Sequence, residues 1–144
     1  RSLYADGDIV WIGTVDGLAR LQNGNVETVL DASMNGLPND NITAIRKTKD
    51  GSFLIGTAEG LVLYDGQQVS LLLEPLSASS MLGLVQAVSD VAIAPDGSLW
   101  VSTYAGLYHG DGQNWEHFTT AEGLPANNVN TVFVDGMPAT SVVA

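Results

Sequence analysis

The chain has 144 residues, of which 45% are hydrophobic, and its formal net charge is −11. Enough apolar residues are present for a folded core, whereas 16 acidic against 5 basic residues argue against a nucleic-acid partner, which needs clustered lysine and arginine. The absence of cysteine excludes disulfides, thiolate metal ligands and cysteine nucleophiles, and without a long apolar run no membrane insertion is expected.

Short apolar or alternating runs separated by glycine turns predict β-strands along the whole chain. The first unit has predicted strands at 2–5, 9–14, 18–21 and 26–30, and the second at 41–47, 53–57, 61–64 and 69–73. The third unit has predicted strands at 88–94, 99–103, 107–109 and 115–119. A fourth unit begins with a strand at 128–134, and a further strand is expected at 138–143. Helical periodicity is absent over any long stretch, although 76–87 has room for a helical turn.

The second unit shows these signals most clearly. Apolar and polar residues alternate over Asn41–Lys47, as in a strand with one buried face. Asp50-Gly51 accepts the positive φ of a tight hairpin turn, and Phe53–Thr57 is mostly apolar, as in a strand covered on both faces. Four short antiparallel strands joined by glycine turns form one blade of a β-propeller, so an all-β fold is expected.

The phrase Thr-x-x-Gly-Leu occurs three times, beginning at Thr14, Thr57 and Thr103. A large apolar residue stands three positions before each threonine: Trp11, Leu54 and Trp100. Repetition with a spacing of 43 and 46 residues is typical of repeat folds, whose units bury apolar surface against one another. We therefore expect Trp11 and Trp100 to pack between blades.

Three linked motifs resemble the two-component-regulator propeller repeat, whose pattern runs GLPxNxVxxI, DGxLWxGT and GLxxYDG. They occur at residues 36–45, 96–103 and 60–66, and the connector at Gly36 recurs at Gly123. The resemblance covers nearly the whole chain and implies a β-propeller. Such repeats are typically found in extracytoplasmic sensor regions of bacterial hybrid histidine kinases, so the resemblance also implies a periplasmic or extracellular sensor domain of bacterial origin.

The repeats predict three blades, at about 1–35, 36–82 and 83–122, and the start of a fourth at about 123–144. Closed propellers need about four to eight blades, and an open array exposes unpaired strand edges at both ends. We therefore predict a propeller segment that this chain does not close alone. The expected partners are the remaining blades of a larger propeller, or another copy or chain that completes the ring.

Other motifs give weaker signals. His109 and His117 lack surrounding carboxylates, so no metal site is assigned, and no cofactor is expected. The acidic turns at 6–8 and 111–114 lack the late glutamate of a calcium loop; we interpret them as hairpins, with calcium as the alternative. The basic cluster at 46–49 is interpreted as a solvated strand end. No nucleophile or nucleotide-binding motif is present, and no catalytic residue is assigned.

Propeller geometry predicts where a binding site lies, because loops between second and third strands share one face with the blade connectors. The predicted ligand-binding residues on this face are Asp16, Asn39, Asp40, Asn41, Glu59, Tyr104, Asn127 and Asn128. These side chains can hydrogen-bond a polar ligand such as a glycan while the tyrosine stacks on it. The alternative is that they are turn residues that satisfy their own backbone.

The sequence thus predicts a non-enzymatic binding module that recognises a polar ligand or a partner protein on its loop face. An alternative is a propeller lyase or hydrolase of the streptogramin-lyase or gluconolactonase type, whose strand motifs look similar. Those enzymes gather histidine, glutamate or metal ligands at the channel mouth, and this chain offers almost none. A third interpretation is a purely structural assembly subunit.

Overall fold

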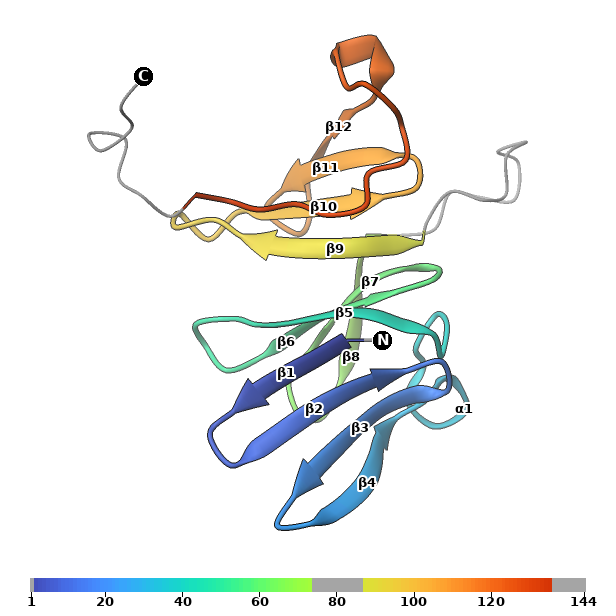
Figure 1. Cartoon of the computed structure of the whole chain (residues 1–144), viewed down its shortest axis with the longest axis vertical. Coiled ribbons are helices and arrows are strands. Elements are labelled where there is room, and N and C mark those ends of the chain that lie inside the picture. Colours follow the sequence, from blue (N-terminus) through green and yellow to red (C-terminus); the bar gives the residue numbers. More distant parts are fainter. Residues whose placement is uncertain (1, 74–86, 136–144) are drawn as a thin grey trace.

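The computed structural model describes residues 2–73 and 87–135 and shows three separate four-stranded antiparallel sheets, which we call blades 1, 2 and 3 (Figure 1). Blade 1 contains β1 (Ser2–Asp6), β2 (Ile9–Thr14), β3 (Gly17–Gln22) and β4 (Asn25–Leu30). Blade 2 contains β5 (Ile42–Lys47), β6 (Phe53–Thr57), β7 (Gly60–Tyr64) and β8 (Val69–Leu73). Blade 3 contains β9 (Val88–Ile93), β10 (Leu99–Thr103), β11 (Gly106–Gly110) and β12 (Trp115–Phe118). Every strand predicted for these three units forms within one residue of its expected bounds.

Two short helical segments precede the Gly-Leu-Pro connectors: α1 (Ala32–Asn35) and the 3-10 helix η1 (Thr120–Glu122). A capping box opens η1, because the Thr119 hydroxyl accepts the Ala121 N–H and the Glu122 carboxylate accepts the Thr119 N–H. The helical turn expected at 76–87 lies outside the described residues except for its last position. The strand expected at 138–143 lies outside them entirely.

The Thr-x-x-Gly-Leu repeat has a local structural cause in all three blades. Each threonine hydroxyl donates to the carbonyl of the glycine three residues later, over 2.9–3.0 Å, and accepts the backbone N–H two residues later. The glycine has a positive φ, 122° at both Gly17 and Gly106. A Cβ on either would lie 2.4 Å from an outer-strand carbonyl oxygen, so both the backbone conformation and the space require glycine.

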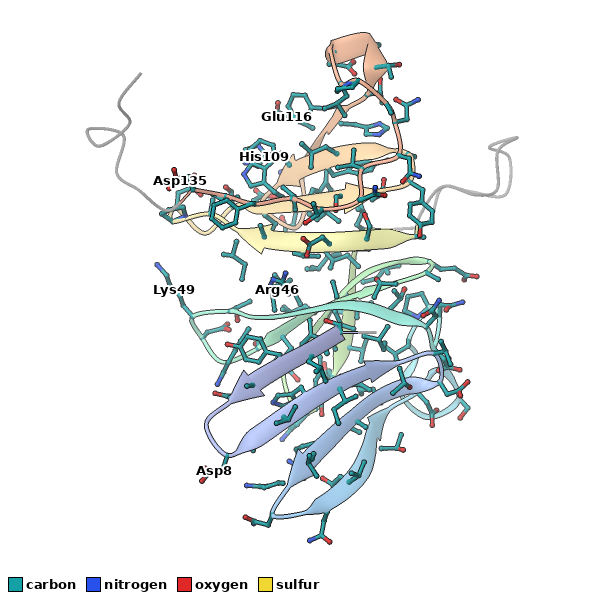
Figure 2. The ribbon with its side chains drawn as sticks, in the orientation of Figure 1. Asp8, Arg46, Lys49, His109, Glu116 and Asp135 are labelled. Carbon is teal, nitrogen blue, oxygen red and sulfur yellow. The ribbon has the colours of Figure 1, made fainter. Side chains whose placement is uncertain are left out.

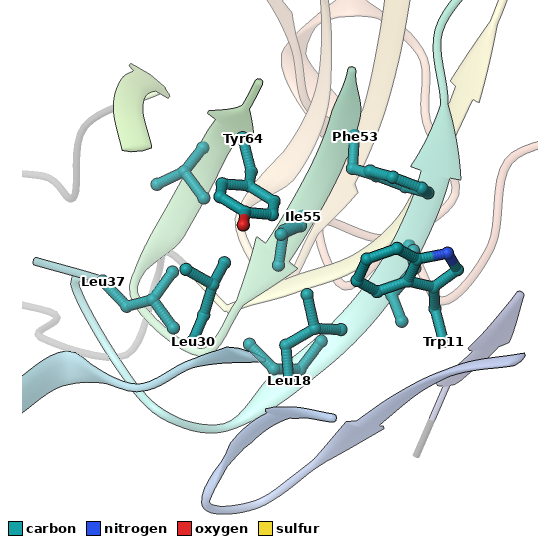
Figure 3. Packing of buried hydrophobic residues seen from close by; sticks show 10 residues of the cluster. Trp11, Leu18, Leu30, Leu37, Phe53, Ile55 and Tyr64 are labelled. Atoms are coloured by element: carbon teal, nitrogen blue, oxygen red, sulfur yellow. The ribbon is translucent and has the colours of Figure 1, made fainter. Parts of the chain in front are cut away.

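Neighbouring blades pack through two apolar clusters. Trp11, Leu18 and Leu30 of blade 1 meet the blade 2 face that carries Phe53 and Tyr64 (Figure 3). The ring centroids of Trp11 and Phe53 are 4.6 Å apart, and Trp11 is only 8% exposed. This confirms the expected packing of Trp11 between blades. The second cluster joins blades 2 and 3, with Leu54 in the position that corresponds to Trp11.

Glycines in β2 and β6 allow the next blade to approach closely. A Cβ on Gly13 would lie 2.6 Å from the Ile42 side chain, and one on Gly56 would lie 2.6 Å from the Val88 side chain. Ile42 and Val88 are both buried residues of inner strands. Each inner strand therefore inserts one branched side chain against a glycine of the preceding blade, which sets the spacing between blades.

The inner strands β1, β5 and β9 lie side by side and are joined by ion pairs (Figure 1). The Lys47 ammonium lies 2.6 Å from the Asp6 carboxylate, and the Arg46 guanidinium lies 2.8 Å from the Asp90 carboxylate. Residues 46 and 47 lie at the end of β5 with partly exposed side chains, as interpreted, but the ion pairs between blades were not predicted. Both side chains bridge blades, because the strands on either side of β5 each contribute an aspartate, Asp6 from β1 and Asp90 from β9.

Blade 3 ends the described array, and this changes two expectations. Trp100 is half-buried and stacks within its own blade on His109, with ring centroids 3.9 Å apart, so its expected packing between blades is not observed. No strand forms at 128–134, contrary to prediction; the segment follows β9 and β10, and the Val129 N–H donates to the Thr103 carbonyl over 2.9 Å (Figure 1). Both differences have one cause. Within the described residues, no further strands pair with this segment or cover Trp100.

Candidate functional site

The turns of the three blades gather at two ends of the array. The β2–β3, β6–β7 and β10–β11 turns lie at the same end as α1, whereas the β1–β2, β5–β6 and β9–β10 turns lie at the opposite end (Figure 1). We call the first end the loop face. Backbone hydrogen bonds also join its loops to connectors: the Ala58 N–H donates to the Asn41 carbonyl over 3.1 Å. The predicted site residues therefore belong to one end of the molecule.

Three of the eight predicted site residues are occupied by turn hydrogen bonds. The Asn39 amide oxygen accepts the Asn41 N–H over 2.9 Å. The Asp40 carboxylate accepts the backbone N–H that begins α1, and the Asn127 amide oxygen accepts the equivalent N–H of η1. These side chains hold the connectors in shape, as the turn interpretation predicts for such residues.

The other predicted residues differ in how accessible they are. Asp16, Glu59, Tyr104 and Asn128 are exposed, and within the described residues their side chains make no hydrogen bond. Tyr104 is 53% exposed, which is high for a ring of this size. The Asn41 amide oxygen is buried without a partner. Four side chains thus remain free to contact a ligand, although no hydrogen bond joins them to one another.

The turns at the opposite end hold carboxylates that serve the hairpins. The Asp111 carboxylate accepts the backbone N–H groups of Asn114 and Gln113 over 2.8 and 2.9 Å, and these bonds lower the pKa of Asp111. The N–H groups of Gln68 and Gln67 lower the pKa of Asp65 in the same way. Hairpin chemistry therefore accounts for Asp111, one of the residues weighed for calcium.

The two histidines lie against aromatic rings. His109, labelled in Figure 2, has its Nε2 3.1 Å from the Ser98 hydroxyl and its ring on Trp100. His117 stacks on Tyr108 with ring centroids 4.1 Å apart, and its Nε2 lies 2.7 Å from the Ala105 carbonyl oxygen. In the part of the chain that the structure describes, no three histidine, aspartate or glutamate side chains converge as metal ligands.

A hollow of about 390 Å³ lies away from the predicted site, between blades 1 and 2. Its lining includes Trp11, Phe53 and Tyr64 together with the Arg20–Glu27 ion pair. Sequence reasoning placed Trp11 in the core and overlooked the hollow beside it. The sequence signal for this hollow was the pairing of Arg20 with Glu27 on the two strands that follow the strand of Trp11.

These blades define an open segment of a β-propeller, and the comparisons agree. Residues 36–59 match the family described as two component regulator propeller, the family whose repeat the motifs resemble. None of the curated proteins compared with the sequence matches it significantly. Among the described residues, no helix has the length and apolarity needed to cross a bilayer.

Solved structures with this fold include extracellular domains from B. thetaiotaomicron. The domain of the hybrid two component system BT3049 has a TM-score of 0.69 and 23% identity, covering 89% of this chain and 18% of its own. The domain of the one component system BT4673 has a TM-score of 0.54 and 22% identity, covering 94% of this chain and 24% of its own. YCF48, in a structure with a bound D1 peptide, has a TM-score of 0.61 and 17% identity, covering 88% of this chain and 41% of its own. The chain thus spans less than half of each, and the likeness establishes the fold.

Proposed function

We propose that this chain is part of a bacterial, extracytoplasmic, sensor-type β-propeller that recognises a polar ligand or a partner protein on its loop face. In this proposal the chain acts without catalysis, and further blades or another chain complete the ring. The family match at residues 36–59 and the extracellular sensor domains that share the fold support this assignment.

One observation carries the binding proposal: the Thr-x-x-Gly turns are closed without using their two central side chains. The threonine hydroxyl and the glycine satisfy the turn in each blade, so the residues between them are free to differ. They include the exposed side chains of Asp16, Glu59 and Tyr104. Carboxylates and a phenol at one end of a rigid scaffold supply hydrogen bonds and a stacking surface, which is the chemistry of a polar binding site.

Isothermal titration calorimetry of the chain against a panel of neutral oligosaccharides and short peptides tests this proposal. We expect saturable heat with at least one panel member, and a loss of that heat in Tyr104→Ala and Asp16→Ala. Asp8→Ala is the matched control, because Asp8 is exposed in the β1–β2 turn at the opposite end (Figure 2). No saturable heat with any probe, or an equal loss in the control, would favour the structural subunit instead.

A further inference from the structure

The hollow between blades 1 and 2 has an aromatic floor and a polar rim. Trp11, Phe53 and Tyr64 contribute the floor; each is at most 8% exposed, so only ring edges reach the hollow. Glu27 on β4 forms part of the rim and is 56% exposed at its side chain. A space of about 390 Å³ is large enough for one or two amino-acid side chains.

The next interface is spanned by an indole ring. Trp115 of blade 3 reaches across to blade 2, where its indole N–H donates to the Leu72 carbonyl over 3.1 Å. One blade earlier, Val69 takes the position of Trp115 and Val29 takes the position of Leu72; Val29 lines the hollow. Valine is too short to bridge the blades. At this position an indole ring spans blades 2 and 3, whereas between blades 1 and 2 Val69 packs against the apolar cluster beside the hollow without lining it.

Three residues that line the hollow also lie in one row across neighbouring strands of blade 1. Trp11, Arg20 and Glu27 lie opposite one another on β2, β3 and β4. The Arg20 guanidinium lies 6.0 Å from the centroid of the Trp11 ring and pairs with the Glu27 carboxylate. In blade 2 the same three positions hold Leu54, Leu63 and Ser70. The ion pair thus occurs at the interface with the hollow, and a row without charged side chains occurs at the interface that Trp115 spans.

Acidic side chains adjoin the hollow, where Arg20 of the lining offsets the charge of Glu27. Besides Glu27, two turn carboxylates of blade 2, Asp50 and Asp65, adjoin the lining glycines Gly51 and Gly66. Hydrogen bonds lower the pKa of both aspartates, so both carry full charge at neutral pH. A Cβ at either glycine would meet nothing within 4 Å, which leaves their backbone open to a neighbouring chain. Because the whole chain has a net charge of −11, it attracts cations from a distance as well.

We propose that the groove between blades 1 and 2 binds an extended basic segment of a partner protein. One apolar side chain of that segment enters the hollow over Trp11, Phe53 and Tyr64, and a flanking lysine or arginine pairs with Glu27. The exposed turns at Gly51 and Gly66 let the partner's backbone lie close to blade 2. This site is separate from the loop face and does not depend on what binds there.

Fluorescence anisotropy with a labelled peptide of alternating lysine and leucine tests the proposal. Peptides with serine in place of leucine, or glutamate in place of lysine, serve as probe controls. We expect saturable binding of the lysine-leucine peptide, at least about tenfold tighter than either control, and weaker binding as salt rises. Equal binding of the serine peptide would overturn the apolar anchor, and equal binding of the glutamate peptide would overturn the charge argument.

Variants of the chain locate the site. Val69→Trp imitates Trp115 and should close the hollow, weakening the peptide at least about tenfold. Val26→Trp makes the same change at the corresponding position of blade 1 and should bind as the wild type does, because Val26 is 65% exposed and, unlike Val69, does not pack against the apolar cluster beside the hollow. Unchanged affinity in folded Val69→Trp, judged by near-UV circular dichroism, would refute the site.

A charge variant decides the matter if Val69→Trp does not fold. Glu27→Gln should weaken the lysine-leucine peptide about threefold or more and reduce its dependence on salt. Glu116→Gln is the control, since Glu116 holds the same position in blade 3 (Figure 2). Equal effects of the two variants would refute a specific site. Tyr104→Ala should leave the binding of this peptide unchanged, which separates the groove proposal from the loop-face function. Displacement of the peptide from the groove by a neutral oligosaccharide would also overturn the groove proposal.

Discussion

Trp11 and Trp100 occupy equivalent positions, but replacing each with alanine should lower the free energy of unfolding by very different amounts. Trp11 is 8% exposed and packs on Phe53 of the next blade. Burial of an aromatic side chain removes about 150–250 Å² from water, which at about 25 cal/mol per Å² gives an upper limit of about 4–6 kcal/mol. Because the surroundings relax in part, we expect Trp11→Ala to lower the free energy of unfolding by about 3–5 kcal/mol.

Trp100 occupies the same position in blade 3, but among the described residues its ring contacts are with His109 and Phe118 of its own blade. It remains half-buried, so Trp100→Ala should cost about 1–2 kcal/mol. Urea unfolding followed by far-UV circular dichroism measures both values in the same protein, provided that the dependence on urea concentration is unchanged. If the two substitutions cost the same, the packing of Trp11 between blades is not what stabilises this position, and the reasoning fails.

Three further substitutions test local parts of the structure. Gly56→Ala should destabilise by about 1–3 kcal/mol in urea unfolding, because the new methyl group collides with Val88; an unchanged midpoint would contradict the spacing between blades. Thr57→Val should cost about 1–3 kcal/mol, since Thr57 is fully buried and closes its turn through two hydrogen bonds. The lowered pKa of Asp65 means that its contribution to stability is present above the ordinary value of 3.8 and lost as the pH falls below it. Asp65→Asn should therefore flatten the loss of stability as the pH falls below 3.8, and an unchanged acid profile would contradict this.

The blades could be predicted from the sequence because turn chemistry repeats where the backbone demands it. The glycine of Thr-x-x-Gly-Leu cannot be replaced without a collision at the outer strand, as Gly17 and Gly106 show. Such positions keep their residue type, and the strands between them follow from alternation. Residues 128–134 have the same alternation, but a strand also needs a pairing partner, which lies outside what a local pattern describes.

The roles of individual side chains were harder to predict. Arg46 and Lys47 look like a solvated basic cluster in the sequence, and only the neighbouring inner strands show that each pairs with a different blade. Asn39 and Asp40 were expected on the loop face, but sequence alone could not decide between ligand binding and turn formation. The hollow beside Trp11 is lined by residues of both blades, and no local sequence pattern indicates that these residues come together.

The central claim is that three separate four-stranded sheets stand side by side, with no strand pairing between sheets in the described residues. Nuclear Overhauser effects measured on the isotopically labelled chain test it most directly. We predict cross-peaks from Gly13 Hα to the Ile42 methyl groups and from Gly56 Hα to the Val88 methyl groups, because a Cβ on either glycine would lie 2.6 Å from a methyl carbon of that neighbour. Backbone cross-peaks that pair β4 with β5, or β8 with β9, in one continuous sheet would contradict it.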